Sequence, residues 1–417
     1  MQHLIIGAGP AGVVAAETLR KTDPDADIAI IGDEPEPPYS RMAIPYYLSD
    51  NIDESGSYLR EPKKHFKAKN IELVQQRVDK LDTKKKQVNL SDGSSRAYDK
   101  LLIATGSHPI SPPIPGLDLP QVHSCWTLED ARNIIKLAQS GSNVVLIGAG
   151  FIGCIILEAL VKRGVNLTVV ETGNRMVPRM LDDKAGGLLE QWCKNQGIDV
   201  HTSCSVESVN AAANDQVDVS LSDGGKLSAA LVITATGVKA NTDLLDGTDI
   251  ETDFGVLVNK RMQSSNTDVY AAGDVAQGVD FSTGNQEVQA IQPTATDHGR
   301  IAALNMAGQG GEHHGTLNMN ILDTVGLVSC SFGLWMGADG GDSAELYNPD
   351  EFQYINLQFD GNFLVGASSV GKTQHIGVLR GLIETKVDLG KWKARLMADP
   401  TAIMDAYIAC TQELGYS

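Results

Sequence analysis

Two stretches of this chain carry the same glycine pattern, and they limit its fold more than any other feature. Residues 4–20 read LIIGAGPAGVVAAETLR, and residues 144–160 read VVLIGAGFIGCIILEAL. In each stretch an apolar run predicts a strand, GxGxxG predicts a tight turn, and a helical stripe of small and apolar residues follows. Such a turn places a pyrophosphate against the free N–H groups at the start of the helix. Two copies indicate that two nucleotides are held at once.

Each residue of this pattern has its own role. The first glycine allows the turn, the second lets the backbone approach a pyrophosphate, and the third lets the helix pack on the strand. An acidic residue about 20 positions later is expected to bind the ribose hydroxyls. The glycines are Gly7, Gly9 and Gly12 in the first copy and Gly148, Gly150 and Gly153 in the second, and the acids are Asp33 or Glu34 and then Glu171.

Glu171 predicts which pyridine nucleotide is preferred. At about 4 Å, a carboxylate would repel the extra phosphate of NADP by on the order of 1 to 4 kcal/mol, depending on the local dielectric. We therefore expect NADH to be preferred over NADPH. Arg175, four residues later, is the one feature that could reverse this preference by pairing with the phosphate.

The remaining elements predict an α/β protein of two or three domains, which suits a chain of 417 residues. Strands are expected at 27–34 and 166–171, so that each glycine turn lies in a strand–helix–strand unit, and Gly164 is expected to end the second helix. Prolines within residues 107–120 predict a crossover between domains near residue 113.

From about residue 315 the pattern changes to alternating strands and turns. One strand is expected at 352–359, an Asp360–Gly361 turn follows, and two or three helical stretches lead to the end of the chain. This tail is predicted to form a third domain. Its residues 372–396 have helical apolar spacing, which suits either a core or a contact between subunits.

Composition disfavours several classes of partner. The formal net charge of -18 disfavours nucleic acid and anionic membrane surfaces, and no apolar run is long enough to insert into a membrane. The N-terminus shows no export signal, so a cytoplasmic location is expected. No cysteines are spaced as a CxxC pair, which argues against a metal, iron–sulfur or disulfide framework. The cysteines are Cys125, Cys154, Cys193, Cys204, Cys330 and Cys410.

Five motifs in order resemble those of the pyridine nucleotide-disulfide oxidoreductase superfamily of FAD flavoproteins. They are GAGPAG at 7–12, YDKLLIATGS at 98–107, GAGFIG at 148–153, ITATGVKANTDLL at 233–245 and VYAAGDVA at 269–276. The resemblance implies two Rossmann-like domains, one for FAD and one for NAD, and a C-terminal α+β domain. The implied division is 1–112 with 240–314 for FAD, 113–239 for NAD, and 315–417 for a C-terminal interface domain that usually forms a homodimer.

The resemblance also implies which residues bind the cofactors. Asp274 is expected to bind the FAD ribityl chain, and the helix that begins at Pro293 is expected to point its positive end at the flavin. His298, on that helix, is expected at the helix surface. The implied FAD contacts are Gly7, Gly9, Pro10, Ala11, Gly12, Asp33, Glu34, Arg41, Val78, Ala104, Thr105, Gly106, Gly273, Asp274, Pro293 and Thr294. The implied NAD contacts are Gly148, Gly150, Phe151, Ile152, Gly153, Glu171 and Gly237.

The loop at 38–50, PYSRMAIPYYLSD, separates branches of the superfamily. Coenzyme A disulfide reductases and NADH oxidases carry a cysteine where this chain has Met42, and a thioether cannot form a thiolate. The loop also resembles that of rubredoxin reductases, ferredoxin reductases and nitrite reductase flavin domains, in which Arg41 would contact the FAD pyrophosphate. Ferredoxin reductases often have a lysine–glutamate pair where this chain has Tyr46 and Ile155. Arg41, Met42 and Tyr46 are expected near the flavin.

Three functions remain open. The leading hypothesis is an FAD-dependent NADH oxidoreductase that passes electrons singly to a rubredoxin- or ferredoxin-like carrier or an iron–sulfur subunit, without a redox-active cysteine. The alternatives are an NADH oxidase that reduces dioxygen, and a slowly turning over FAD- and NADH-binding subunit for assembly or signalling. Lys84, Lys85 and Lys86 form a basic segment where an acidic carrier could dock.

Overall fold

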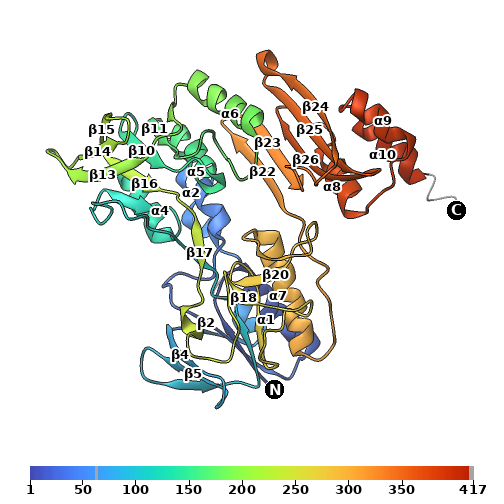
Figure 1. Cartoon of the computed structure of the whole chain (residues 1–417). Coiled ribbons are helices and arrows are strands. Elements are labelled where there is room, and N and C mark those ends of the chain that lie inside the picture. Colours follow the sequence, from blue (N-terminus) through green and yellow to red (C-terminus); the bar gives the residue numbers. More distant parts are fainter. Residues whose placement is uncertain (62–63, 413–417) are drawn as a thin grey trace. The chain divides into compact units, whose positions relative to one another are not determined.

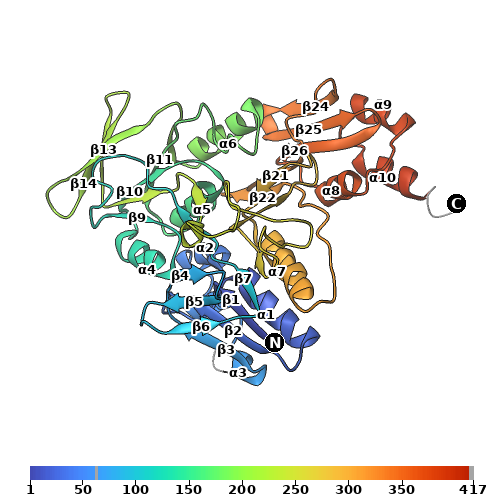
Figure 2. The ribbon, with the colours of Figure 1, turned by 60° about the horizontal axis from the view of Figure 1, so that its bottom comes forward.

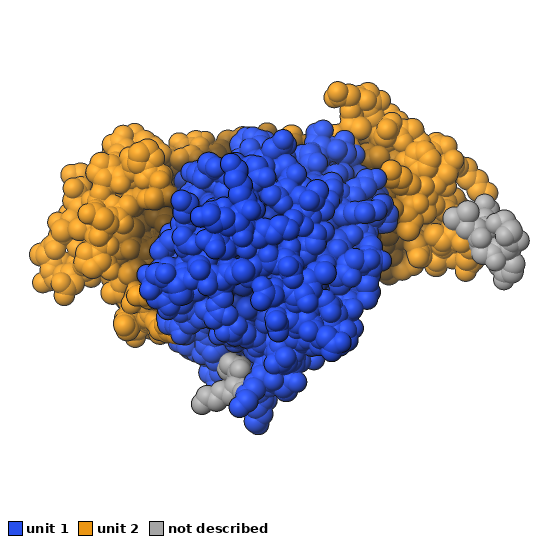
Figure 3. Space-filling model, turned by 90° about the horizontal axis from the view of Figure 1, so that it is seen from below, with its two compact units in different colours: residues 1–110, 238–316 blue, residues 111–237, 317–417 orange. Residues whose placement is uncertain are grey.

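The computed structural model describes residues 1–61 and 64–412, and its chain divides into two compact units (Figure 3). The first unit comprises residues 1–110 and 238–316, and the second comprises 111–237 and 317–417. The expected crossover near residue 113 thus lies close to a boundary between units. The tail beyond residue 316 belongs to the same unit as the segment with the second glycine pattern, and its standing as a separate domain stays a prediction.

The first unit is built on a five-stranded parallel sheet in the order β19-β7-β1-β2-β3. Ile5 and the apolar run 101–103 lie fully buried in it, because a parallel sheet is covered on both faces. Helices α1 and α7 pack against each other on this sheet (Figure 1). The bounds are β1 (Gln2–Ile6), α1 (Pro10–Thr22), β2 (Asp27–Gly32), β3 (Ile71–Gln75), β7 (Lys100–Ile103), β19 (Val269–Ala271) and α7 (Gln292–Met306).

The close approach of α1 and α7 depends on a glycine. A Cβ added at Gly299 would lie 2.3 Å from the carbonyl oxygen of Ala11, so only glycine fits there. Small sheets and short helices complete this unit (Figure 2). They are α2 (Ile44–Leu48), α3 (His65–Ala68), β4 (Val78–Asp82), β5 (Gln87–Leu90), β6 (Ser95–Ala97), β8 (Ser107–Pro109), β17 (Val238–Ala240), β18 (Val256–Leu257), β20 (Ala276–Val279) and β21 (Gln286–Val288).

The second unit contains another five-stranded parallel sheet, in the order β12-β11-β10-β16-β9. A three-stranded antiparallel sheet, β13-β14-β15, adjoins it. The bounds are β9 (Val122–Ser124), α4 (Leu128–Leu137), β10 (Asn143–Ile147), α5 (Phe151–Lys162), β11 (Asn166–Val170), α6 (Asp183–Asn195), β12 (Asp199–His201), β13 (Val206–Ala211), β14 (Val217–Leu221), β15 (Lys226–Ala229) and β16 (Leu231–Thr234).

The same unit ends in a five-stranded antiparallel sheet, β22-β23-β26-β25-β24, followed by helices. Trp192 of α6 anchors this sheet, since its Nε1 donates to the carbonyl of Val325 at 3.1 Å and its ring meets that of Phe352 edge-on. The bounds are β22 (Met319–Thr324), β23 (Leu327–Gly333), β24 (Asp342–Asn348), β25 (Gln353–Asp360), β26 (Phe363–Val370), α8 (Ile376–Glu384), α9 (Lys391–Ala398) and α10 (Ile403–Gln412).

The α/β fold predicted from the sequence is confirmed. The strands expected at 27–34 and 166–171 are β2 and β11, and α5 ends just before Gly164, which has φ +74°. The Asp360–Gly361 turn joins β25 to β26. Within the described part of the chain, no helix is both long enough and apolar enough to cross a membrane.

Candidate cofactor sites

The first glycine pattern forms an open cradle at the start of α1. Gly7 has φ +117°, and a Cβ there would lie 2.0 Å from the carbonyl oxygen of Ala104. A Cβ at Gly12 would lie 2.0 Å from the carbonyl oxygen of Gly7, whereas nothing lies within 4 Å of a Cβ at Gly9. Gly9 is the N-cap of α1 and no side chain caps the helix, which leaves room for a pyrophosphate at its N-terminus.

The second glycine pattern repeats this geometry at α5. Gly148 has φ +101° and a Cβ there would lie 2.6 Å from the carbonyl oxygen of Ala235, while a Cβ at Gly153 would lie 2.1 Å from that of Gly148. Gly150 is again the N-cap, with open space around it and no side-chain cap. Phe151 and Ile152 form the first turn of α5. Both patterns therefore fit a dinucleotide.

Glu171 follows β11 and turns back to the second glycine pattern. Its side chain is buried, with a residue exposure of 8%. Oε2 accepts a hydrogen bond from the backbone N–H of Ala149 at 2.7 Å, and Oε1 accepts one from that of Gly173 at 2.7 Å. These charge-assisted bonds fix the carboxylate beside the turn. Oε1 also accepts from the hydroxyl of Thr172 at 3.3 Å, so Oε2 is the oxygen that keeps a lone pair for a ribose hydroxyl.

The acid of the first unit lies at a different place. In the second unit, Val170 pairs with Ile147 and directly precedes Glu171. In the first unit, Ile31 pairs with Ile6 in the same way, so Gly32 is the residue that corresponds to Glu171. Asp33, the next residue, is exposed. Glu34 is the acid that lies in a polar network, with Tyr39 and Arg41.

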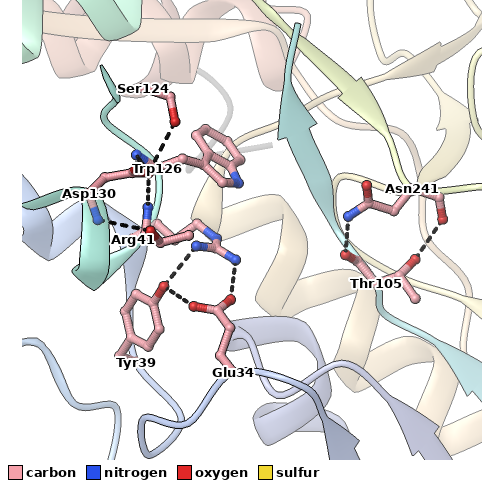
Figure 4. A network of polar contacts seen from close by, with 9 residues as sticks. Glu34, Tyr39, Arg41, Thr105, Ser124, Trp126, Asp130 and Asn241 are labelled. Carbon is pink, nitrogen blue, oxygen red and sulfur yellow. Dashed lines mark hydrogen bonds and ion pairs between the residues drawn. The ribbon is translucent and has the colours of Figure 1, made fainter. Parts of the chain in front are cut away.

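In that network, Arg41 and Glu34 form an ion pair (Figure 4). Arg41 Nη2 donates to Glu34 Oε1 at 2.5 Å, and Arg41 Nη1 donates to the hydroxyl of Tyr39 at 2.8 Å. The Tyr39 hydroxyl donates to the other oxygen of Glu34 at 2.5 Å. Glu34, one of the two acids predicted for the FAD ribose, and Arg41, predicted for the pyrophosphate, thus lie together and orient each other.

Asp274 lies half-buried beside the ATGS motif. Its Oδ2 accepts a hydrogen bond from the hydroxyl of Ser107 at 2.9 Å. Burial raises the pKa of Asp274, while the Ser107 hydrogen bond and the charge of Arg41 lower it. The carboxylate can therefore accept hydrogen bonds from further hydroxyl groups, such as those of a ribityl chain.

A reciprocal pair of hydrogen bonds joins Thr105 and Asn241, which are 136 residues apart in the motifs at 98–107 and 233–245. The Thr105 hydroxyl donates to the carbonyl of Asn241 at 2.9 Å, and the Asn241 side chain donates to the carbonyl of Thr105 at 2.7 Å (Figure 4). Ser107 and Asn241 were not predicted as site residues, although both lie in the motifs at 98–107 and 233–245. Their membership of those motifs was the only signal.

Residues 1–303 match the family model of pyridine nucleotide-disulphide oxidoreductases. The chain belongs to this family. It is 31% identical over 406 residues, or 96% of each chain, to "NADH-dependent phenylglyoxylate dehydrogenase subunit epsilon" of Aromatoleum evansii. It is 32% identical to an NADH oxidase of Methanocaldococcus jannaschii, over 76% of this chain and 72% of that one. A ferredoxin reductase from Rhodopseudomonas palustris has a similar solved structure, with a TM-score of 0.81, 27% identity, and coverage of 89% of this chain and 91% of that one.

The protein is thus an NAD(P)H-dependent flavoprotein oxidoreductase that uses FAD and NAD(H). The remaining residues implied for FAD lie in the first unit. Ala11 faces Gly273 from α1, Val78 begins β4, Ala104 and Gly106 flank Thr105, and Pro293 and Thr294 lie in the first turn of α7. Gly237, implied for NAD, has φ +110° and ends the second unit's first segment. The role of each of these residues in cofactor binding stays a prediction.

The flavoprotein loop at 38–50 carries no thiol. Met42 lies in a 3-10 turn with 48% of its surface exposed, and Tyr46 lies in α2 with 57% exposed. No disulfide joins any of the six cysteines, all of which lie in the described residues, and burial raises the pKa of Cys154 and raises the pKa of Cys193 and Cys330 to about 12. These three thiols are protonated near neutral pH and cannot act as nucleophiles.

The prediction that His298 lies at the helix surface is wrong. His298 is only 2% exposed, and its ring meets that of His313 edge-on, with 4.6 Å between the ring centres. Neither ring nitrogen has a hydrogen-bond partner among the described residues, and burial and His313 lower the pKa of His298 to about 3. Sequence spacing did not reveal this burial, because α7 is covered by more than one neighbouring element.

The basic segment at residues 84–86 is partly neutralised. Lys86 pairs with Asp268 at 2.6 Å, and Lys85 lies 3.7 Å from Asp82. Asp268 also pairs with Lys100 at 2.7 Å. Since nearby carboxylates offset these charges, the segment offers an acidic carrier less attraction than the sequence suggested.

Proposed function

We propose that this flavoprotein passes electrons between NADH and a one-electron carrier, which is either a small iron–sulfur protein or an iron–sulfur subunit of a larger enzyme. The observation that carries the proposal is the side chain of Met42, which is exposed on the loop where thiol-dependent relatives carry a cysteine. The buried thiols of Cys154, Cys193 and Cys330, whose pKa values are raised, offer no replacement. FAD, when bound, accepts a hydride and releases electrons singly.

The side chains of the protein would then bind, orient and exclude water. The Gly9 turn would hold the FAD pyrophosphate, and Asp274, fixed by Ser107, would accept hydrogen bonds from ribityl hydroxyls. The α7 N-terminus, which has no side-chain cap, would stabilise negative charge on the ring. Glu171 would hold the adenosine ribose of NADH. No side chain needs to move a proton.

The relatives support this proposal in two ways. One relative that matches 96% of the chain is named as a subunit of an NADH-dependent dehydrogenase, and another similar protein is named a ferredoxin reductase. The first name is that of a subunit of a larger enzyme, and the second names ferredoxin as the protein that is reduced. We also propose that residues 315–417 form a homodimer interface and that the protein acts in the cytoplasm.

A second candidate is an NADH oxidase, because a protein of that name is 32% identical. One experiment separates the two functions. The purified holoenzyme receives one equivalent of NADH without oxygen, and loss of the oxidised-flavin absorbance is followed. Air is then admitted in one arm and an oxidised ferredoxin in the other. We expect fast reoxidation by the ferredoxin and slow reoxidation by air. Reoxidation by air within the turnover time would establish the oxidase instead.

A further inference from the structure

The loop between β11 and α6, residues 172–182, lies against the nucleotide side of the second unit. Its Gly173 N–H donates to Glu171 Oε1, and its Val177 N–H donates to the carbonyl of Ala149 at 2.8 Å. Ala149 in turn donates to the other oxygen of Glu171. The position of this loop therefore sets the orientation of the Glu171 carboxylate.

Arg175 fastens the loop internally. Its Nε donates to the carbonyl of Leu181 at 2.8 Å, its Nη2 to that of Pro178 at 3.2 Å, and its Nη1 to Asp183 Oδ1 at 2.6 Å. A Cβ at Gly186 would lie 2.9 Å from Arg175 Cδ, so the arginine stem lies directly on α6. The loop thus behaves as one body whose position depends on where its end is held.

The end of the loop is held by the C-terminal sheet. Asp182 Oδ1 caps α6 by accepting from the N–H of Ala185 at 2.9 Å. Its other oxygen, Oδ2, accepts from the hydroxyl of Tyr354 and from Asn356 Nδ2, the latter at 3.3 Å. Tyr354 is fully buried, and burial together with Asp182 raises its pKa, so it stays a hydrogen-bond donor at any ordinary pH.

The sheet face that carries Tyr354 and Asn356 is polar. One cross-strand row on this face runs over all five strands, and beside it Lys184 of α6 pairs with Glu345 at 2.5 Å. Figure 2 shows α6 next to these strands. The row is Asn320, Ser331, Ser368, Asn356 and Glu345. The contact of α6 and its N-cap with this face includes directed polar bonds, from Tyr354 and Asn356 to Asp182 and from Lys184 to Glu345.

We propose that Tyr354 is a positioning residue for pyridine nucleotide binding: through Asp182 it holds the 172–182 loop, and with it Glu171, in the geometry that binds the adenosine ribose. The C-terminal sheet is then part of the NADH site. This inference rests on the proposed role of Glu171, and it does not depend on which acceptor receives the electrons.

The test compares holoenzyme variants by calorimetric titration with NAD⁺ and ADP-ribose, and by turnover with reduced nicotinamide mononucleotide, which lacks the adenosine half. Tyr354→Phe removes only the hydroxyl. We expect it to weaken NAD⁺ and ADP-ribose binding roughly 5- to 20-fold, since a charge-assisted bond that orients the loop is lost. The kcat/KM for the mononucleotide is expected to change less than about twofold, and the flavin spectrum should not change.

Tyr347→Phe is the matched control. Tyr347 lies opposite Tyr354 on β24, its ring meets that of Tyr354 edge-on, and 45% of its surface is exposed. The affinities of Tyr347→Phe for NAD⁺ and ADP-ribose should equal those of the wild type. Asn356→Ala removes the second donor to Asp182, so if Tyr354→Phe does not fold, Asn356→Ala should show the same ligand pattern with a smaller loss.

Glu171→Gln distinguishes the ribose-binding role of Glu171 from the positioning role of Tyr354. Loss of ADP-ribose affinity in Glu171→Gln but not in Tyr354→Phe would overturn the positioning role and leave the ribose assignment standing. Unchanged affinity in both variants would overturn the assignment and the positioning role together. An equal loss for ADP-ribose and the mononucleotide in Tyr354→Phe would also overturn the proposal, because it would indicate general destabilisation.

Discussion

The Glu171 carboxylate lies 2.7 Å from the backbone nitrogen of Ala149, which stands between the first two glycines of the second pattern. The acid is therefore fixed to the turn that is expected to hold the pyrophosphate. Removing its charge should weaken both the turn and the selectivity for NADH. In Glu171→Gln we expect the KM for NADH to rise roughly tenfold, since a buried charge-assisted bond contributes about 1.5 to 3 kcal/mol.

The same variant should lose discrimination against NADPH. The carboxylate no longer repels the 2′-phosphate, so the NADPH-to-NADH ratio of kcat/KM should rise at least about fivefold. Steady-state kinetics with both nucleotides would measure it. An unchanged ratio would show that selectivity arises elsewhere.

Arg175 is not expected to set the nucleotide preference. Its guanidinium is committed to two backbone carbonyls and to Asp183 and Asn174 at 2.6 Å and 2.9 Å. Arg175→Ala should leave the NADPH-to-NADH ratio within about twofold, because the backbone bonds from Ala149 and Gly173 that orient Glu171 remain. It should lower the melting temperature by several degrees, because a half-buried network of bonds is lost. The ratio and a thermal melt would be measured together. A several-fold drop in the ratio would show that Arg175 does reach the phosphate.

Local signals explain why much of this site could be predicted from the sequence. Glycine turns, flanking strands and the acid after β11 all lie within about 30 residues of one another, and only glycine fits where a Cβ would meet a carbonyl at 2.0 Å. The Asp182–Tyr354 bond joins residues 172 positions apart, and nothing in either neighbourhood predicts it. The burial of His298 likewise depends on distant segments that cover α7. Glu34 and Arg41 were each predicted as FAD contacts, but the ion pair between them was not predicted.

Turnover should be insensitive to thiol reagents. Cys154, Cys193 and Cys330 are buried and their pKa values are raised, and Met42 replaces the thiol of the loop. Treatment of the native enzyme with N-ethylmaleimide at pH 7.5 should change the rate of flavin bleaching by NADH by less than about twofold. A thiol-dependent disulfide reductase treated in parallel after NADH reduction is the control. Rapid inactivation of this enzyme would indicate a reactive cysteine in the electron path.

Acid should destabilise the first unit through His298. Burial lowers its pKa to about 3, so in the folded state the ring stays neutral, while in the unfolded chain it takes up a proton below its ordinary pKa near 6.5. Between these values the unfolded state binds more protons, and stability is lost as the pH falls. At pH 5 the loss from this residue is about 2 kcal/mol. His313 and Asp297 face the ring, the former lowering and the latter raising its pKa.

Since neither ring nitrogen has a hydrogen-bond partner among the described residues, His298→Leu removes the titration without breaking a described bond. Urea unfolding of both proteins at pH 8 and pH 5, with excess FAD, should show a pH-dependent loss about 2 kcal/mol smaller in the variant. Equal losses in the two proteins would mean that the acid sensitivity comes from other groups.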